Sequence, residues 1–100
     1  MKRSFEKEIL EELLSDSATM VDGVLYRPET ILKLGSSRWH DLRALVFSVR
    51  ANGAFTYWRT PTYRVGKTEQ QDSELWEDTV VCTQVKPVEK QITVIEYEAL

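Results

Sequence analysis

The chain has 100 residues, of which 42% are hydrophobic and 29% are charged. This size and balance indicate one globular domain, residues 1–100, and argue against a disordered chain. No apolar run approaches the ~20 residues that a membrane-spanning helix needs, and the first residues lack the uninterrupted apolar stretch of a secretory signal. The single cysteine, Cys82, cannot form an intrachain disulfide, so we expect a reducing, cytoplasmic location.

The formal net charge of −3 is unevenly distributed along the chain. Residues 1–26 carry three basic and six acidic side chains, residues 27–67 carry eight and two, and residues 68–100 carry two and eight. A basic middle between acidic ends can indicate an anion-binding face. The alternative is that basic strands lie beside acidic strands, so that cross-strand pairs neutralise them.

The first predicted element is an amphipathic helix from Ser4 to Leu14. Ser4 is the expected N-cap, and the polar residues 15–17 are expected to end the helix. A helix of about eleven residues is marginal alone, so we predict that it packs across a sheet; a helix that binds a partner or dimerises is the alternative. Its apolar stripe consists of Phe5, Ile9, Leu10, Leu13 and Leu14.

Residues 22–37 predict a first hairpin. Asp22-Gly23 is a turn sequence, and Pro28-Glu29 separates two strand-like runs, residues 24–27 and 30–34. A short helix beginning at Pro28 is the competing interpretation, because proline is favoured in the first turn of a helix. Residues 35–37 break either element.

The strongest local signal is the Asn52-Gly53 dipeptide between two runs rich in β-branched and aromatic residues. A type I′ turn needs positive φ at both central positions, which asparagine and glycine tolerate. We therefore predict a two-residue hairpin over residues 42–60, called the central hairpin below. The turn fixes a register in which residues 45–51 oppose residues 54–60.

This register divides the side chains of the central hairpin between two faces, because directly opposed residues share a face. One face is the predicted core and holds Leu45, Phe47, Val49, Thr56 and Trp58. The other, called the aromatic-basic face below, holds Val46, Ser48, Arg50, Phe55, Tyr57 and Arg59.

Three further strands are predicted after the central hairpin. Pro61 interrupts the ladder, residues 62–65 form a short strand, and residues 67–74 form an exposed loop. Residues 76–86 and 91–98 then form two strands with apolar side chains on both faces. The expected fold class is α+β: an N-terminal amphipathic helix packed on a curled antiparallel β-meander of five to seven strands, or a partly open barrel.

Catalytic chemistry has little support in the sequence. The only histidine, His40, precedes Asp41, and neighbours in a strand point to opposite faces; only a turn would let them meet, with a serine of residues 36–37 as nucleophile. Cys82 lies among valines and is expected to be a small buried hydrophobe. Residues 69–78 are acidic but match no calcium-binding pattern. We predict no enzymatic activity, no cofactor and no metal.

A binding function has more support. Aromatic residues and arginine are typical of protein–protein hot spots. We expect a non-enzymatic module that binds a protein partner, or its own copy, through the aromatic-basic face or a sheet edge. Seven residues on or near this face form the candidate site: Arg43, Arg50, Phe55, Tyr57, Arg59, Tyr63 and Arg64.

Two alternatives apply to the same residues. One is a binder of single-stranded nucleic acid or another anionic ligand, which uses stacking and phosphate contacts. A pI near 5.2 argues against general affinity for nucleic acid. The other is a structural role, in which the N-terminal helix covers this face and makes Phe55 and Tyr57 part of the core. No membrane partner is expected.

Overall fold

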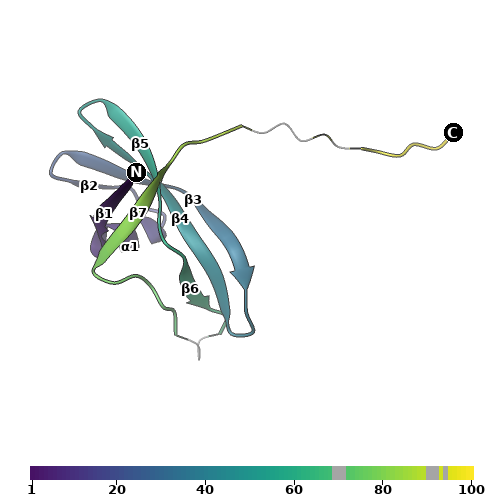
Figure 1. Cartoon of the computed structure of the whole chain (residues 1–100), viewed down its shortest axis with the longest axis horizontal. Helices are drawn as coiled ribbons and strands as arrows, with labels where there is room; N and C mark the ends of the chain where they lie inside the picture. The colour runs from purple at the N-terminus through teal and green to yellow at the C-terminus, as the bar shows by residue number, and fades with distance from the viewer. Residues whose placement is uncertain (69–71, 90–92, 94) are drawn as a thin grey trace.

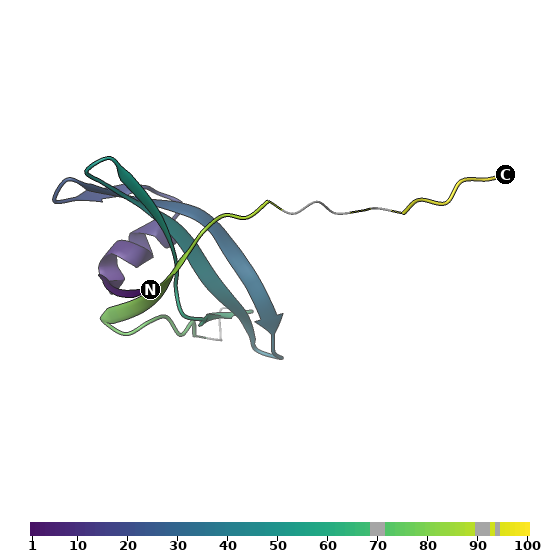
Figure 2. The ribbon, with the colours of Figure 1, turned by 45° about the horizontal axis from the view of Figure 1, so that its top comes forward.

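The computed structural model describes residues 1–68, 72–89, 93 and 95–100. Figure 1 shows one antiparallel sheet that curls into a half-barrel, and Figure 2 shows the single helix of the described part inside the curl. The predicted fold class is confirmed. The elements are β1 (Lys2–Glu6), α1 (Lys7–Leu14), β2 (Thr19–Val21), β3 (Val24–Ser36), β4 (His40–Ala51), β5 (Ala54–Arg59), β6 (Tyr63–Gly66) and β7 (Thr79–Val85).

The strand order in the sheet is β1-β7-β5-β4-β3-β2, and β6 pairs with the part of β4 that β5 does not reach. Neighbours in sequence are therefore mostly neighbours in space, as in a meander, but β1 lies at the far edge beside β7. This placement puts the two ends of the folded body side by side.

The N-terminal strand makes α1 shorter than predicted. The chain pairs with β7 before it turns into the helix, so α1 begins at Lys7 and Ser4 is not its N-cap. Glu6 takes the N-cap position with extended dihedral angles and makes no side-chain cap hydrogen bond. Phe5 matched the helical spacing because, although it belongs to β1, it packs in the same core as Leu10.

β3 is one continuous strand where the sequence predicted a hairpin or a helix, and both predictions are wrong. The Asp22-Gly23 turn joins β2 to β3, with φ values of 51° and 78°. The register between β3 and β4 shifts between Pro28 and Thr30, which leaves Glu29 as the extra residue of a bulge. A bulge interrupts the ladder locally, so the strand can continue through a proline.

The central hairpin has the predicted register. Residues 46–51 of β4 pair with residues 54–59 of β5 around the Asn52-Gly53 turn, whose φ values are 51° and 77°. Thr60 extends the ladder by one step: its N–H donates to the Leu45 carbonyl at 2.9 Å, and its Oγ1 accepts from the Leu45 N–H at 2.9 Å. The strand ends there, before the proline that was predicted to interrupt it.

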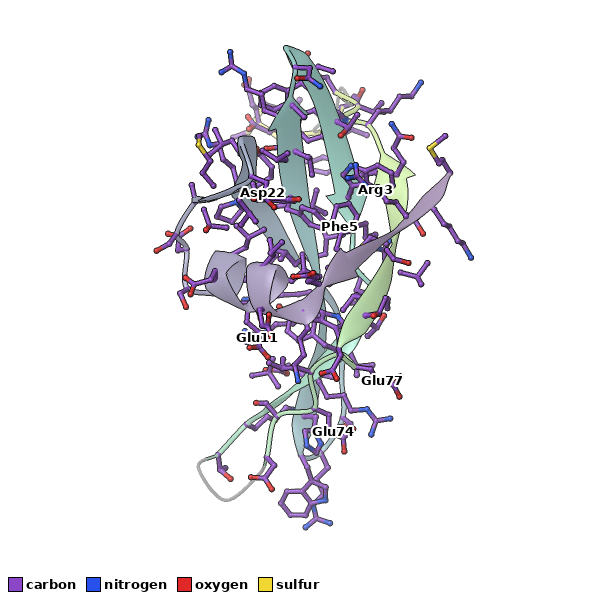
Figure 3. The ribbon with its side chains drawn as sticks, turned by 90° about the vertical axis from the view of Figure 1, so that its left-hand side faces the viewer. Arg3, Phe5, Glu11, Asp22, Glu74 and Glu77 are labelled. Carbon is purple, nitrogen blue, oxygen red and sulfur yellow. The ribbon has the colours of Figure 1, made fainter. Side chains whose placement is uncertain are left out.

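The inner face of the half-barrel is the core, and the residues predicted from the register are buried there except Thr56, which is half-buried. Phe47 is fully buried, and the ring of Phe5 meets it edge-on with 5.0 Å between centroids. Figure 3 looks onto α1 and shows Phe5 between β1 and the strands behind it. Leu10 and Leu13 of α1 complete this core from the inside. The other buried members from β4 and β5 are Leu45, Val49 and Trp58.

The C-terminal part departs from the prediction. β7 is shorter than the expected strand 76–86, and Trp76 lies before it, packed edge-on against Tyr63 at 4.9 Å. The predicted strand 91–98 is wrong at 93 and 95–98, which belong to no strand, whereas residues 91, 92 and 94 lie outside the described part. A strand needs a neighbour to bond with, and Figure 1 shows the end of the chain away from the sheet.

Residues 67–74, predicted as an exposed loop, are exposed at 67, 68 and 72–74; residues 69–71 lie outside the described part. Glu74 forms a backbone bridge with Arg64, so this segment is attached to β6 rather than free along its whole length. No helix in the described part of the chain is long and apolar enough to cross a membrane.

Two phenylalanines on opposite faces of the central hairpin test this division of the sheet. Phe47→Ala should lower the free energy of unfolding by about 3–5 kcal/mol, because it removes a fully buried ring and leaves a cavity. The matched change Phe55→Ala removes a ring that is 46% exposed and should cost less than about 1 kcal/mol. Urea unfolding followed by tryptophan fluorescence measures both. Equal losses would contradict the assignment of the two faces.

Candidate functional site

The aromatic-basic face is the outer, convex face of the half-barrel. α1 lies on the opposite side of the sheet, so the structural alternative in which the helix covers Phe55 and Tyr57 is wrong (Figure 2). The Phe55 ring is 46% exposed, and its centroid lies 5.7 Å from that of Tyr57, with the two planes tilted by 42°. Tyr57 and Arg59 are half-buried by their neighbours within the sheet.

An open groove of about 430 Å³ crosses this face. It runs over four adjacent strands, and the start of the tail that follows β7 forms part of its wall. The side chains along it are mainly apolar, with an arginine and a lysine among them. The residues that define it are Thr30 and Leu32 of β3, Val46 of β4, Tyr57 and Arg59 of β5, and residues 85–87. We call it the outer groove.

Glu29 adds an acidic group to the outer groove, and its position follows from the bulge in β3. The extra residue of a bulge breaks the alternation of side chains, which re-aims it relative to its neighbours. The Ser48 hydroxyl donates to Oε1 of Glu29 at 2.7 Å. Ser48 is fully buried, so this hydrogen bond satisfies a hydroxyl that would otherwise be costly to bury.

Positive charge on the outer face is not neutralised within the described part of the chain. Arg27 faces the same side as Ser48, its cross-strand partner, and Arg50 faces the same side as Phe55. Neither they nor Arg59 form an ion pair with a residue that the structure describes. The ion pairs found lie elsewhere: Lys7–Glu11, Arg43–Asp41, Arg64–Glu74 and Lys67–Asp41.

Three of the seven candidate residues lie apart from the other four. Arg43 and Tyr63 oppose each other across β4 and β6, on the inner side, where Tyr63 belongs to the core. Burial raises the pKa of Tyr63, and the nearby Arg43 cation offsets part of this shift. Arg64 is exposed at the far end of the sheet, with Nη1 3.8 Å from Oε2 of Glu74. Arg50, Phe55, Tyr57 and Arg59 share the outer face.

Sequence reasoning missed the residues that β3 and the tail contribute to the outer groove. The sequence pattern places Thr30 and Leu32 in the second strand of a hairpin, residues 85–86 at the end of a strand with no known neighbour, and Pro87 in the connection after it. Placing them needs two long-range pairings: that of β3 with β4, which sets Thr30 opposite Val46, and that of β5 with β7, which sets Tyr57 opposite Val85. Glu29 carried no signal, because one sequence does not reveal a bulge.

The residues considered for catalysis do not form a nucleophile–base pair. Nε2 of His40 lies 3.0 Å from the carbonyl oxygen of Asp72, and the Ser37 hydroxyl accepts from the backbone N–H of His40 at 3.1 Å rather than contacting its ring. The Asp41 carboxylate instead meets Arg43 at 3.7 Å. Within the described residues, no group of three or more His, Cys, Asp or Glu side chains is placed to hold a metal ion.

Cys82 is part of the core, as predicted. Its side chain is fully buried, and its thiol lies 3.9 Å from the carbonyl oxygen of Val80. Burial raises the pKa of this thiol to about 12 by disfavouring the thiolate. Because the thiolate is the reactive form, Cys82 is inert near neutral pH.

Compared with protein-family models, with curated proteins and with solved structures, the chain shows no significant match in any of the three.

The Cys82 thiol should report on opening of the core. At pH 8 the native protein should react with Ellman's reagent far more slowly than the urea-unfolded chain, because unfolding restores an ordinary thiol pKa and exposes the sulfur. Absorbance at 412 nm measures the reaction. An equally fast reaction of the native protein would contradict the burial of Cys82.

Proposed function

We propose that this protein is a small, non-enzymatic interaction module that binds a protein partner through its outer face. The observation that carries this proposal is the outer groove on the face that α1 leaves open, where apolar residues lie beside Arg59, which forms no ion pair with a described residue. A reducing, cytoplasmic location is compatible with a buried, unpaired cysteine and remains part of the proposal.

The chemistry of the groove indicates what kind of segment it would bind. Leu32, Val46 and Val85 offer apolar area, whose burial contributes about 25 cal/mol per Å². Tyr57 and Arg59 are of the residue types that dominate binding energy at protein interfaces. A segment that combines apolar and acidic side chains would match both features, because its carboxylates could pair with the arginines while its apolar groups displace water.

A second candidate is an anionic ligand such as single-stranded nucleic acid. It is favoured by Arg50 and Arg59, which form no ion pair with a described residue, and by the exposed Phe55 ring beside Tyr57, on which a base could stack. Against it stand the overall pI near 5.2 and the carboxylate of Glu29 within the groove. We therefore rank the protein partner first.

A peptide selected against the protein from a displayed random library tests the first proposal. We expect selected peptides to alternate apolar and acidic residues. Arg59→Glu and Tyr57→Ala should each weaken binding roughly tenfold or more in a fluorescence anisotropy titration, because each removes a contact of the groove. Thermal midpoints should remain within a few degrees of wild type, since neither side chain belongs to the core.

Arg38→Glu is the matched control for charge, because Arg38 is exposed in the turn between β3 and β4, outside the groove. It should leave peptide affinity nearly unchanged. Loss of the fold in the Tyr57 variant would mean that the face is structural. Titration with a labelled single-stranded oligonucleotide tests the second candidate, which requires binding at low salt that falls steeply with ionic strength.

A further inference from the structure

Most of β3 has a strand on only one side. β2 pairs with residues 24–26 alone, so from residue 27 to residue 36 the only described neighbour of β3 is β4. Figure 1 shows this half of β3 at the rim of the sheet. Such an edge presents backbone N–H and C=O groups that a further strand can bond. Between the two bulges, residues 30–33 form an uninterrupted stretch of this edge.

The core is incomplete beside this edge. A hollow of about 260 Å³ lies between the end of α1 and β3. Its apolar lining consists of Leu13, Leu14, Pro28, Ile31 and Leu45, and its polar lining consists of Asp16, Glu29 and Thr30. Ile31 opposes the fully buried Leu45 and so faces the inner side, yet it is 41% exposed. Apolar side chains brought over the hollow would bury Ile31 and extend the core.

Residues 95–100 have an alternating pattern that suits a strand added to this edge. Residues 95–100 read Ile-Glu-Tyr-Glu-Ala-Leu, so in an extended strand Ile95 and Tyr97 share one face while Glu96 and Glu98 share the other. Ile95 is 73% exposed and Tyr97 is 94% exposed. These two side chains are open to water, and they would form one apolar face if the segment paired with a sheet edge.

We propose that residues 95–100 of a second copy of this chain add as a strand to the free edge of β3. Ile95 and Tyr97 would then cover the hollow beside Ile31, and the glutamates would lie on the outer side of the sheet, where Arg27 is exposed and unpaired within the described residues. Main-chain hydrogen bonds supply affinity in this mode of binding, and alternate side chains supply register.

A second copy suits this arrangement better than the same chain. The tail leaves the folded body at residues 85–87, on the outer face, and Figure 2 shows its end far from β3 of its own chain. Reciprocal exchange of the two tails about a two-fold axis fills both edges at once and closes the assembly. The inference concerns the edge and the hollow, so it does not rest on the outer groove.

The mass in solution, measured by sedimentation velocity over a range of concentrations, tests the inference. We expect the full chain to reach twice its monomer mass of 11.6 kDa. The double variant Ile95→Asp, Tyr97→Asp should raise the dimer dissociation constant at least tenfold, because it places carboxylates against Leu13, Leu14 and Ile31 and near the acidic Asp16 and Glu29. Val88→Asp changes another exposed apolar residue of the tail, outside the proposed strand, and should leave the constant unchanged.

Changes on the receiving side complete the test. Ile31→Lys should also weaken the dimer at least tenfold, because an inward-pointing charge blocks edge pairing. Val81→Lys is its control, since Val81 is 49% exposed and lies on the outer side, away from β3. If Ile31→Lys fails to fold, the tail variants still decide, because the tail side chains are exposed.

Three results would overturn the inference. A full chain that stays monomeric at about 100 μM lacks the assembly altogether. If the double tail variant still dimerises, the two copies associate through another surface, such as one sheet edge against the other. In a monomer, slow exchange of those amides of residues 30–33 that point away from β4 would mean that the edge is filled by the tail of the same chain. None of these results bears on peptide binding at the outer groove.

Discussion

The two-residue turn at Asn52-Gly53 is the constraint on which the rest of the structure depends. It sets which residues of β4 and β5 stand opposite one another, and side chains alternate strictly along a strand. A slip of one residue would carry Phe47 and Trp58 to the outside and bring Arg50 and Arg59 into the core. The loss of free energy would exceed the small net stability of a domain of this size. The turn therefore decides both what is buried and what remains available for binding.

The position of α1 follows from this division. β1 pairs with β7 at one edge of the curled sheet. The helix that continues from β1 lies on the concave side of the sheet rather than across the outer face (Figure 2). Leu10 and Leu13 thereby meet the apolar face that the central hairpin presents. The bulges in β3 favour the curl, since a bulged strand bends and twists more than a regular one. The outer face stays open because the only described helix packs on the inner face.

The sequence predicts this protein well where the signals are local. The central hairpin, its register and its core residues follow from a dipeptide and an alternating pattern. The limits of α1 do not, because Phe5 satisfies a helical spacing while belonging to a strand. Pro28 suggested a turn because a bulge has no signature in one sequence. Of the candidate site, the four residues fixed by the turn do come together, whereas Arg43 and Tyr63 were grouped with them by closeness in the chain, and pairing of β6 with β4 places them on the inner side.

The uneven charge of the chain acquires a structural meaning from this arrangement. The basic middle forms β3, β4 and β5 at the centre of the sheet, and the acidic end includes a tail whose last residues touch none of them (Figure 1). Cross-strand neutralisation is found at Arg64 but not at Arg27, Arg50 or Arg59 within the described residues. While they are hydrated, the arginine side chains destabilise the fold little. Their attraction to a carboxylate is strongest when apolar neighbours of that carboxylate exclude water. An acidic and apolar strand or peptide would therefore match the sheet as proposed, and residues 95–100 have this composition.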